Sequence, residues 1–405
     1  MSKLNRVNWW TRRTEVPPYE VVGPLERVDE RDNVIRRNWL VPGTPAYKEY
    51  YAAHPEREKI DRRCRLYPNK ERKHWKQMAM YRKYPLTLGF IDNLGPQKRN
   101  CVEDVAPQRI EIEPRLASES IKGVARYMGA DVVGICEINP AWVYSHRMRD
   151  DGFSEPVELK DRYAVVVAVG SDFNMMLASR GFSRAKDIEG MRTDDKKVTI
   201  VSRLASYIRN LGYPAQVHSR LTSRGGGVLI QPLAVDAGLG EMGRASLLMN
   251  KKFGPAVSMA VVTTDMPLAV DKPVDLGVRD FCSKCLKCAE CCPTKSISFG
   301  DMEVIRGVKL WRFDAESCYR LRMAVGDSHI CGRCVSVCPW TKPTNIIHQT
   351  AADIAIHFPF TRRPLVWIDD FLYGRKPRQH PLPGWLEPGK RRSLKQKIIT
   401  AFHKI

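Results

Sequence analysis

Nine of the twelve cysteines in this 405-residue chain lie between residues 282 and 338, and the spacing of eight of them dictates how that stretch can fold. The first motif runs Cys-x-x-Cys-x-x-Cys-x-x-x-Cys-Pro and begins at Cys282. The second runs Cys-x-x-Cys-x-x-x-Cys-Pro, begins at Cys331, and is preceded by a lone Cys318. Such runs of thiolates are typical of [4Fe–4S] ferredoxins. The spacing therefore predicts a ferredoxin-like segment that holds two [4Fe–4S] clusters.

The two motifs are expected to exchange one ligand each, because in two-cluster ferredoxins the cysteine before the proline ligates the other cluster. The first predicted ligand set is Cys282, Cys285, Cys288 and Cys338. The second predicted ligand set is Cys292, Cys318, Cys331 and Cys334. Zinc also selects thiolates, but a zinc ribbon would use half of these cysteines and has no need of the Cys-Pro elements. The adjacent Cys291 leaves one ligand formally ambiguous, and the proline favours Cys292.

The remaining cysteines are predicted to be ordinary thiols; they are Cys64, Cys101, Cys136 and Cys291. Arg12-Arg13 could suggest an export signal, but the residues that follow are polar and contain no apolar segment. No stretch approaches the 18 apolar residues of a membrane span. We therefore expect a mature form that starts at Met1, in the cytoplasm, where clustered cysteines indicate metal ligation and not disulfides.

The formal net charge of +21 is an unusual excess of positive charge. A field of that sign attracts acidic partners, such as an acidic ferredoxin or flavodoxin, nucleic acid, or an anionic membrane surface. Charge alone does not choose among these three.

Four regions are expected along the chain. They are an N-terminal wrapping extension (1–105), a cofactor-binding α/β domain (106–277), a two-cluster ferredoxin-like domain (278–345) and a C-terminal extension (346–405). Apolar periodicity and turn residues predict the helices and the short buried strands. The predicted helices span 47–53, 72–81, 121–129 and 197–210. The predicted strands span 132–135, 163–169, 228–230 and 257–263.

Several fragments occur in a fixed order through most of the chain. They include Tyr19-Glu20-Val21, Pro42-Gly43-Thr44-Pro45-Ala46-Tyr47, Ile208-Arg209-Asn210-Leu211-Gly212-Tyr213, Ala237-Gly238-Leu239-Gly240-Glu241-Met242-Gly243-Arg244, Gly254-Pro255, Thr264-Asp265-Met266-Pro267-Leu268, Cys338-Pro339-Trp340 and Asp369-Asp370-Phe371-Leu372-Tyr373-Gly374. In this order the fragments resemble the corrinoid iron–sulfur reductive dehalogenases and, more distantly, epoxyqueuosine reductase. Their shared order makes the resemblance specific.

The resemblance implies an α+β fold in which a nitroreductase-like α/β sandwich holds base-off cobalamin against a two-cluster ferredoxin-like domain. The chain has no Asp-x-His-x-x-Gly cobalamin motif, which agrees with the family's lack of a protein ligand to cobalt. Glycines let a backbone approach a large flat cofactor. By resemblance, corrin contacts are expected at Gly238, Leu239, Gly240 and Gly243. Gly225-Gly226-Gly227 is either a second contact or a flexible turn.

Reduction of a carbon centre needs a proton donor, and a nearby positive group stabilises developing negative charge. Arg244 matches the position of the basic active-site residue in dehalogenases; the alternative is a surface salt bridge. The family's donor Tyr is missing from 191–198, and this stretch is more similar to epoxyqueuosine reductase, in which an Asp serves. Asp194 is therefore the candidate acid, with Asp195 as a substitute; an acidic first turn of a helix is the other reading. His218 is a further candidate, although a structural histidine is favoured.

Two basic segments suggest further partners. Residues 62–84 interleave Lys and Arg with aromatic residues, a pattern that can bind RNA but more often forms a solvated face. Near the C-terminus, Leu394, Ile398 and Phe402 share one helical face among lysines. This predicts a basic amphipathic helix able to lie on an anionic membrane, on a partner, or on its own core.

Together these features predict a cytoplasmic, cobalamin-dependent oxidoreductase that removes halogen from a small organic substrate. A separate ferredoxin- or flavodoxin-type protein would donate the electrons. One alternative is cobalamin-dependent reduction of a substrate without halogen, such as a modified tRNA nucleoside. Another is an iron–sulfur electron carrier that binds no corrinoid.

Overall fold

The computed structural model describes residues 11–65, 104–148, 154–181, 185–219, 226–324, 331–376, 380–383 and 385–386. A strand that is buried at every position, β5 (Tyr163–Gly170), lies at the centre of its largest sheet. The order is β2-β5-β9-β6 and every pairing is antiparallel. The partners of β5 are β2 (Val132–Glu137) and β9 (Val257–Thr264), and β6 (Ala215–His218) pairs with β9.

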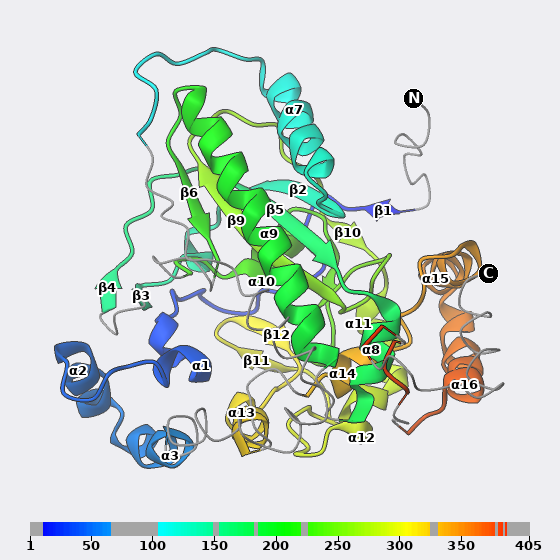
Figure 1. The fold of residues 1–405 in the computed structure, drawn as a ribbon. Helices are drawn as coiled ribbons and strands as arrows, with labels where there is room; N and C mark the ends of the chain where they lie inside the picture. The colour runs from blue at the N-terminus through cyan, green and yellow to red at the C-terminus, as the bar shows by residue number, and fades with distance from the viewer. Residues whose placement is uncertain are drawn as a thin grey trace.

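Helices cover both faces of this sheet, which explains why its strands are continuous apolar runs. One face packs against α7 (Pro114–Tyr127) and the long α9 (Ala185–Asn210), as Figure 1 shows. The other face packs against α10 (Ile230–Asp236). Alternate residues of β5 enter the two cores, with Val165 on the α9 side and Val166 on the α10 side.

Several short elements surround the sheet. The 3₁₀ helices are η2 (Pro140–Trp142), η3 (Ser179–Gly181) and η4 (Pro359–Thr361). The hairpins are β3 (His146–Met148) with β4 (Ser154–Pro156), and β7 (Glu241–Met242) with β8 (Leu248–Met249). Helix α8 (Phe173–Ala178) precedes α9.

The N-terminal segment runs along the molecule from β1 (Arg12–Arg13), paired with β10 (Val274–Asp275), to helices α1–α3 at the opposite side in Figure 1. Its later elements are η1 (Glu30–Asp32), α1 (Val34–Arg37), α2 (Pro45–Ala53) and α3 (Pro55–Arg65). The buried guanidinium of Arg37 pairs with Asp61 on α3 and with Glu316 on α13. This ion-pair cluster fastens the segment to the cysteine-rich region.

The cysteine-rich region consists of short helices and one hairpin. They are α11 (Val278–Cys285), α12 (Lys287–Cys291), β11 (Glu303–Ile305), β12 (Val308–Leu310), α13 (Ala315–Ala324) and α14 (Arg333–Ser336). Two further helices follow, α15 (Ile346–His357) and α16 (Arg362–Tyr373), and pack against α11 in a separate apolar cluster. No described helix is both long enough and apolar enough to span a bilayer.

The mixed helix-and-strand fold is confirmed, and most predicted elements match it in position. The predicted strand 228–230 is wrong: Val228 forms only an isolated bridge with Val143, and Ile230 begins α10. Helix α9 begins at Ala185, well before the predicted start, and β6 was not predicted. The predicted helices at 72–81 and near the C-terminus lie outside the described residues.

Candidate functional site

The first predicted ligand set comes together in the structure around the turn between α11 and α12. Burial raises the pKa of the Cys288 thiol well above its ordinary value, and the adjacent thiols of Cys282, Cys338 and Cys285 raise it further. Leu286, at a left-handed φ of 55°, breaks the helix between the second and third cysteines of the motif. This break turns the chain so that these three thiols face the fourth, which comes from the second motif.

The second predicted set also comes together. Burial raises the pKa of the Cys334 thiol to about 12, with Cys331, Cys318 and Cys292 as the adjacent thiols that add to it. Cys292 behaves differently, because the Thr294 hydroxyl and the backbone N–H of Ser296 lie 3.5 Å and 3.3 Å from its sulfur. Despite its burial, these hydrogen bonds lower its pKa and favour the thiolate that a metal ligand must be.

The two sets adjoin each other, since Cys334 is also among the thiols that act on Cys288. Cys291 is turned away from both sets, and its thiol donates to the carbonyl oxygen of Arg375 at 3.3 Å. The structure therefore separates the adjacent cysteines 291 and 292, which the sequence left formally ambiguous.

The donor set fits iron–sulfur cubanes, which need four thiolates spread around a cluster and not converged on one point. A narrow cavity beside Met249 and Pro255 is lined by thiols of the first set and by Cys334. Within the described residues, no three His, Cys, Asp or Glu side chains are arranged to hold a single metal ion. A preformed mononuclear zinc site is therefore not found among these residues.

Arg244 lines the same cavity. The predicted alternative, a surface salt bridge, is not found: the residue is buried, and it forms no salt bridge with any described residue. Its guanidinium donates to the carbonyl oxygens of Cys282, Ser298 and Gly300 at 3.0, 2.8 and 2.9 Å. It also stacks on the Trp311 ring, 4.6 Å from the centroid. Burial lowers its pKa from the ordinary value, yet an arginine keeps its charge. A buried positive charge thus lies against the first cysteine set.

The predicted corrin contacts do not form an open cradle. A Cβ on Gly238 would meet the carbonyl oxygen of Lys272 at 2.4 Å, and one on Gly240 would meet that of Met249 at 2.1 Å. Leu239 is buried in the core beneath the sheet, and Gly243 packs on the Met249 side chain. Glycine is required here because protein backbone approaches closely. The protein itself therefore fills the Cβ side of these glycines, and a corrin contact at the four residues stays a prediction.

Asp194 lies on α9 in a buried polar cluster. Its carboxylate is 2.6 Å from the ammonium of Lys197, and it accepts a hydrogen bond from the Ser258 hydroxyl at 3.0 Å. Lys197 in turn donates to that hydroxyl at 2.8 Å. Because the Asp194 carboxylate accepts from the Ser258 hydroxyl and pairs with the ammonium, Lys197 is the donor group of this cluster. Asp194 is not in the first turn of the helix, and it caps nothing there.

The cluster opens into a polar cavity of about 140 Å³ between α9 and the start of β9. Pro255 lines both this cavity and the one beside the cysteines, so the two are separated by a single residue. Lys197 and Ser258 were not predicted. The position of Lys197 one helical turn after Asp194 was the available signal, whereas Ser258 comes from a distant strand.

His218 is a structural histidine. It is fully enclosed between the carbonyl oxygen of Gly226 and the hydroxyl of Thr263, and burial lowers its pKa to about 4. A histidine that stays neutral at pH 7 is a poor proton donor. Gly226 is described and Gly225 is not, so a contact by the whole triple glycine stays a prediction.

The segment that brings the cysteines together defines the class of protein. The sequence model of a 4Fe–4S dicluster domain matches residues 281–342, which contain both motifs. The prediction of an iron–sulfur segment is confirmed at this level.

The predicted resemblance to reductive dehalogenases is also confirmed. A tetrachloroethene reductive dehalogenase of Desulfitobacterium hafniense is 31% identical over 285 residues, 58% of this chain and 50% of the relative. The solved structure of a reductive dehalogenase aligns with this chain with a TM-score of 0.73 and 29% identity. The alignment covers 91% of this chain and 49% of the dehalogenase, whose structure is described as suggesting a mechanism for B12-dependent dehalogenation. The epoxyqueuosine reductase of Escherichia coli is 32% identical over 161 residues, 35% of this chain and 38% of the relative.

The chain spans about half the length of the curated dehalogenases it matches. The solved structure nevertheless covers 91% of this chain, so most of the sheet and of the cysteine-rich region lie within the shared part.

Proposed function

We propose that this protein is an iron–sulfur oxidoreductase that removes halogen from a small organohalide. The observation that carries the proposal is the exchange of Cys338 and Cys292 between two buried, adjoining thiol sets, in a chain that resembles reductive dehalogenases. Two [4Fe–4S] clusters, when bound, would supply one-electron transfer. We propose the eight cysteines as their ligands, in the two sets given above.

Arg244 is proposed to stabilise the negative charge that reduction adds beside the first set. Its guanidinium is fixed by three carbonyl oxygens and a Trp ring, so the charge needs no rearrangement when an electron arrives. In this proposal Arg244 acts on the electron path, and a direct contact with substrate is not required.

The Asp194–Lys197–Ser258 cluster is proposed to supply the proton for the carbon that loses halogen. Lys197 would donate the proton, and the Asp194 carboxylate would hold the ammonium in place. The cavity that they line shares Pro255 with the cavity beside the first thiol set, which suits a step that joins electrons and protons.

A cobalt corrinoid, when bound, would supply the centre that breaks the carbon–halogen bond; this part of the proposal rests on the resemblance alone. Its contacts at Gly238, Leu239, Gly240 and Gly243 are proposed from the same resemblance, and the protein's own backbone fills the Cβ side of Gly238 and Gly240. The resemblance likewise carries three further proposals. They are a nitroreductase-like fold of the sheet domain, the base-off state of the cobalamin, and a ferredoxin- or flavodoxin-type electron donor.

The test is anaerobic reconstitution with iron, sulfide and cobalamin, followed by assays of halide release from tetrachloroethene, halogenated phenols and haloalkanes. Release that depends on both the clusters and the corrinoid would support the proposal. Iron–sulfur absorption without a corrinoid band and without halide release would instead favour an electron carrier.

A second candidate, reduction of a modified tRNA nucleoside, is favoured by the acidic residue at 194 and by the similarity to epoxyqueuosine reductase. Filter binding with tRNA separates the two proposals. Specific binding that survives added salt would support the second candidate, because nonspecific binding of a +21 protein falls steeply with salt.

A further inference from the structure

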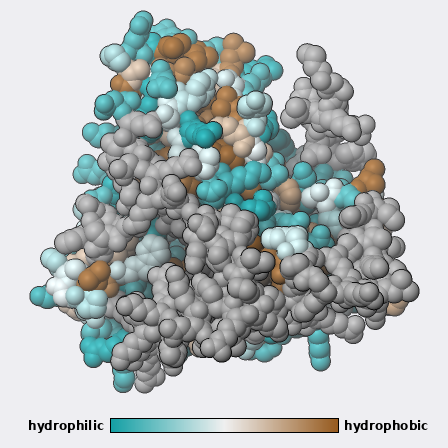
Figure 2. All heavy atoms as spheres, viewed as in Figure 1, coloured by the Kyte–Doolittle hydropathy of each residue, from teal (hydrophilic) through white to brown (hydrophobic). Residues whose placement is uncertain are grey.

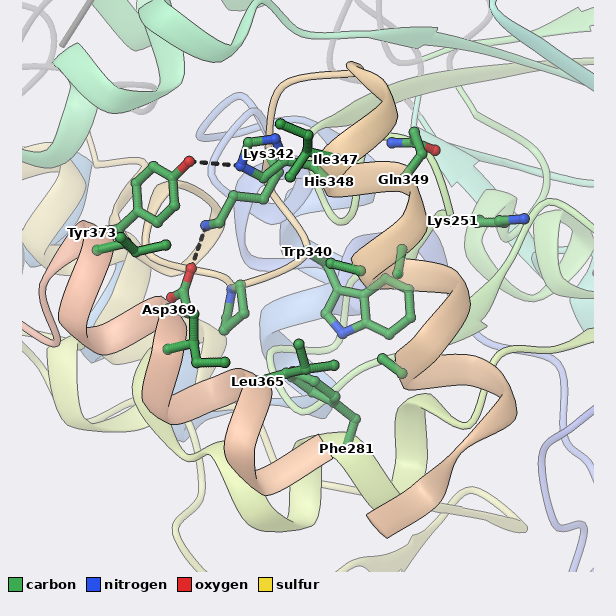
Figure 3. Close-up of a pocket in the computed structure, with 16 residues that line it drawn as sticks. Lys251, Phe281, Trp340, Lys342, Ile347, His348, Gln349, Leu365, Asp369 and Tyr373 are labelled. Atoms are coloured by element: carbon green, nitrogen blue, oxygen red, sulfur yellow. Dashed lines mark hydrogen bonds and ion pairs between the residues drawn. The ribbon is translucent and has the colours of Figure 1, made fainter. Parts of the chain in front are cut away.

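A cavity of about 180 Å³ lies between helices α11, α15 and α16 and the loop after Cys338, next to the cavity of the first thiol set, with which it shares Phe281, Pro339 and Trp340. Figure 3 shows the Trp340 indole on one side, near Leu365 and Phe281, and two polar pairs toward the other end. In these pairs Lys342 lies 2.7 Å from Asp369, and His348 lies 2.7 Å from the Tyr373 hydroxyl. The middle of the cavity is therefore apolar, with these two pairs at one end and Lys251 and Gln349 at the other.

Trp340 offers this cavity a hydrogen-bond donor for which the described residues supply no acceptor. The residue is 7% exposed, and no atom in the described part of the chain accepts a hydrogen bond from its indole Nε1. Buried donors are nearly always paired, so an unpaired one indicates an acceptor that the protein itself does not supply. In Figure 3 the nitrogen is turned toward the space beside Leu365.

The mouth of the cavity is apolar and exposed. Ile347, Ile368 and Leu372 line the cavity and are 57%, 44% and 58% exposed. Further exposed apolar side chains occur on α15, η4 and α16, namely Ile346, Ile354, Phe358, Phe360, Trp367 and Phe371. Figure 2 shows hydrophobic residues at the right edge, where α15 lies. Exposed apolar side chains at the mouth of a cavity suit the binding of an apolar group.

We propose that this cavity binds the ring of a lipophilic quinone. A carbonyl oxygen would accept the hydrogen bond of Trp340 Nε1, and the hydrocarbon tail would lie over the exposed side chains of Ile347, Ile368 and Leu372. A cavity of roughly 150 Å³ already accommodates a benzene ring, so the volume suits a single-ring quinone. The site lies against the first thiol set, because Phe281 precedes Cys282 and Trp340 follows the Cys338-Pro339 pair. The proposal goes beyond dehalogenation and does not rest on it.

The test measures binding, by equilibrium dialysis with the anaerobically reconstituted full chain. Duroquinone and durene form a matched pair, because both are tetramethylated six-membered rings and only duroquinone carries oxygens. We expect duroquinone to bind at least tenfold more tightly than durene, and decylplastoquinone more tightly still because of its tail. Equal binding of duroquinone and durene, or no binding of either, would overturn the proposal.

Variants then locate the site. Trp340→Phe keeps the aromatic ring and removes the donor, so duroquinone should bind about tenfold more weakly, while durene should be unaffected. Trp367→Phe makes the same change on the exposed face of α16, outside the cavity, and should leave both affinities unchanged. Iron content and near-ultraviolet circular dichroism check that each variant folds. An equal loss in both variants would assign the binding to the exposed surface and refute the cavity.

Discussion

The guanidinium Nε of Arg244 donates a hydrogen bond to the carbonyl oxygen of Cys282 at 3.0 Å, so a buried cation on the β7–β8 hairpin is fixed to the first cysteine of the ferredoxin-like segment. The contact joins two parts of the chain that are remote in sequence. It also means that the electrostatics of the first thiol set depend on a residue that is not one of its ligands.

The first prediction concerns the reduction potential. Arg244→Gln should make the adjacent cluster harder to reduce, lowering its midpoint potential by on the order of tens of millivolts, because a positive charge stabilises the added electron. An electron-paramagnetic-resonance redox titration measures the shift. Arg312→Gln, whose side chain is 73% exposed, is the control and should leave the potential unchanged. Identical potentials in all three proteins would remove Arg244 from the electron path.

The second prediction distinguishes the neighbouring cysteines. Cys291→Ser should retain the full iron and sulfide content, because its thiol contacts only the Arg375 carbonyl oxygen among the hydrogen-bonding partners of the described residues. Cys292→Ser should lose about half of the iron, since it removes one ligand of the second set. Iron and acid-labile sulfide analyses measure both. The reverse pattern would exchange the proposed roles of the two residues.

A third prediction concerns proton supply. Asp194→Asn and Lys197→Gln should each reduce the rate of halide release by about 100-fold or more, the range of a lost general acid. The double variant should be little worse than either single variant, because the two residues act as one unit. Asp195→Asn is the neighbouring control and should retain activity. Full activity in Lys197→Gln would rule out the proposed donor.

The fourth prediction is a pH dependence of stability. Burial raises the pKa of Glu241 from 4.5 to about 7. The backbone N–H groups of Leu276 and Val278 donate hydrogen bonds to its carboxylate and lower the pKa, but burial has the larger effect. The folded state therefore favours the protonated acid. The contribution of Glu241 to the free energy of unfolding is fully present below pH 4.5 and is lost as the pH rises through 7. The loss amounts to about 3 kcal/mol by the usual conversion of a pKa shift.

Urea unfolding of the wild type and of Glu241→Gln at pH 5 and pH 8 measures this effect. Glutamine stays neutral at both pH values. The free energy of unfolding of the variant, relative to that of the wild type, should therefore be higher at pH 8 than at pH 5. Glu137→Gln, with an exposed carboxylate, should show no such gain. A constant difference between Glu241→Gln and wild type would contradict the raised pKa.

The sequence predicted what depends on local pattern. Strand β5 could be predicted from the sequence because a strand buried on both faces must be apolar throughout. The cysteine spacing predicted the two thiol sets because short loops restrict which thiols can meet. The strand at 228–230 was wrong because a three-residue apolar run does not distinguish a strand from the first turn of α10.

Features that depend on distant partners could not be predicted. Ser258 reaches Lys197 only because β9 lies beneath α9, and the unpaired Trp340 donor exists only because α15 and α16 close over it. The glycines at 238 and 240 were interpreted as a cofactor contact, which stays a prediction; their close approach to the carbonyl oxygens of Lys272 and Met249 is a packing role that a one-dimensional pattern does not contain.

The exchange of Cys292 and Cys338 has a consequence for biosynthesis. During translation, the second set is complete only when Cys334 has emerged from the ribosome and the first only when Cys338 has emerged, although the first three cysteines of the first motif appear some fifty residues earlier. Cluster insertion therefore has to wait until both motifs have been synthesised. A nascent protein that stalls before the second motif would present only partial sets, which an assembly factor could recognise as unfinished.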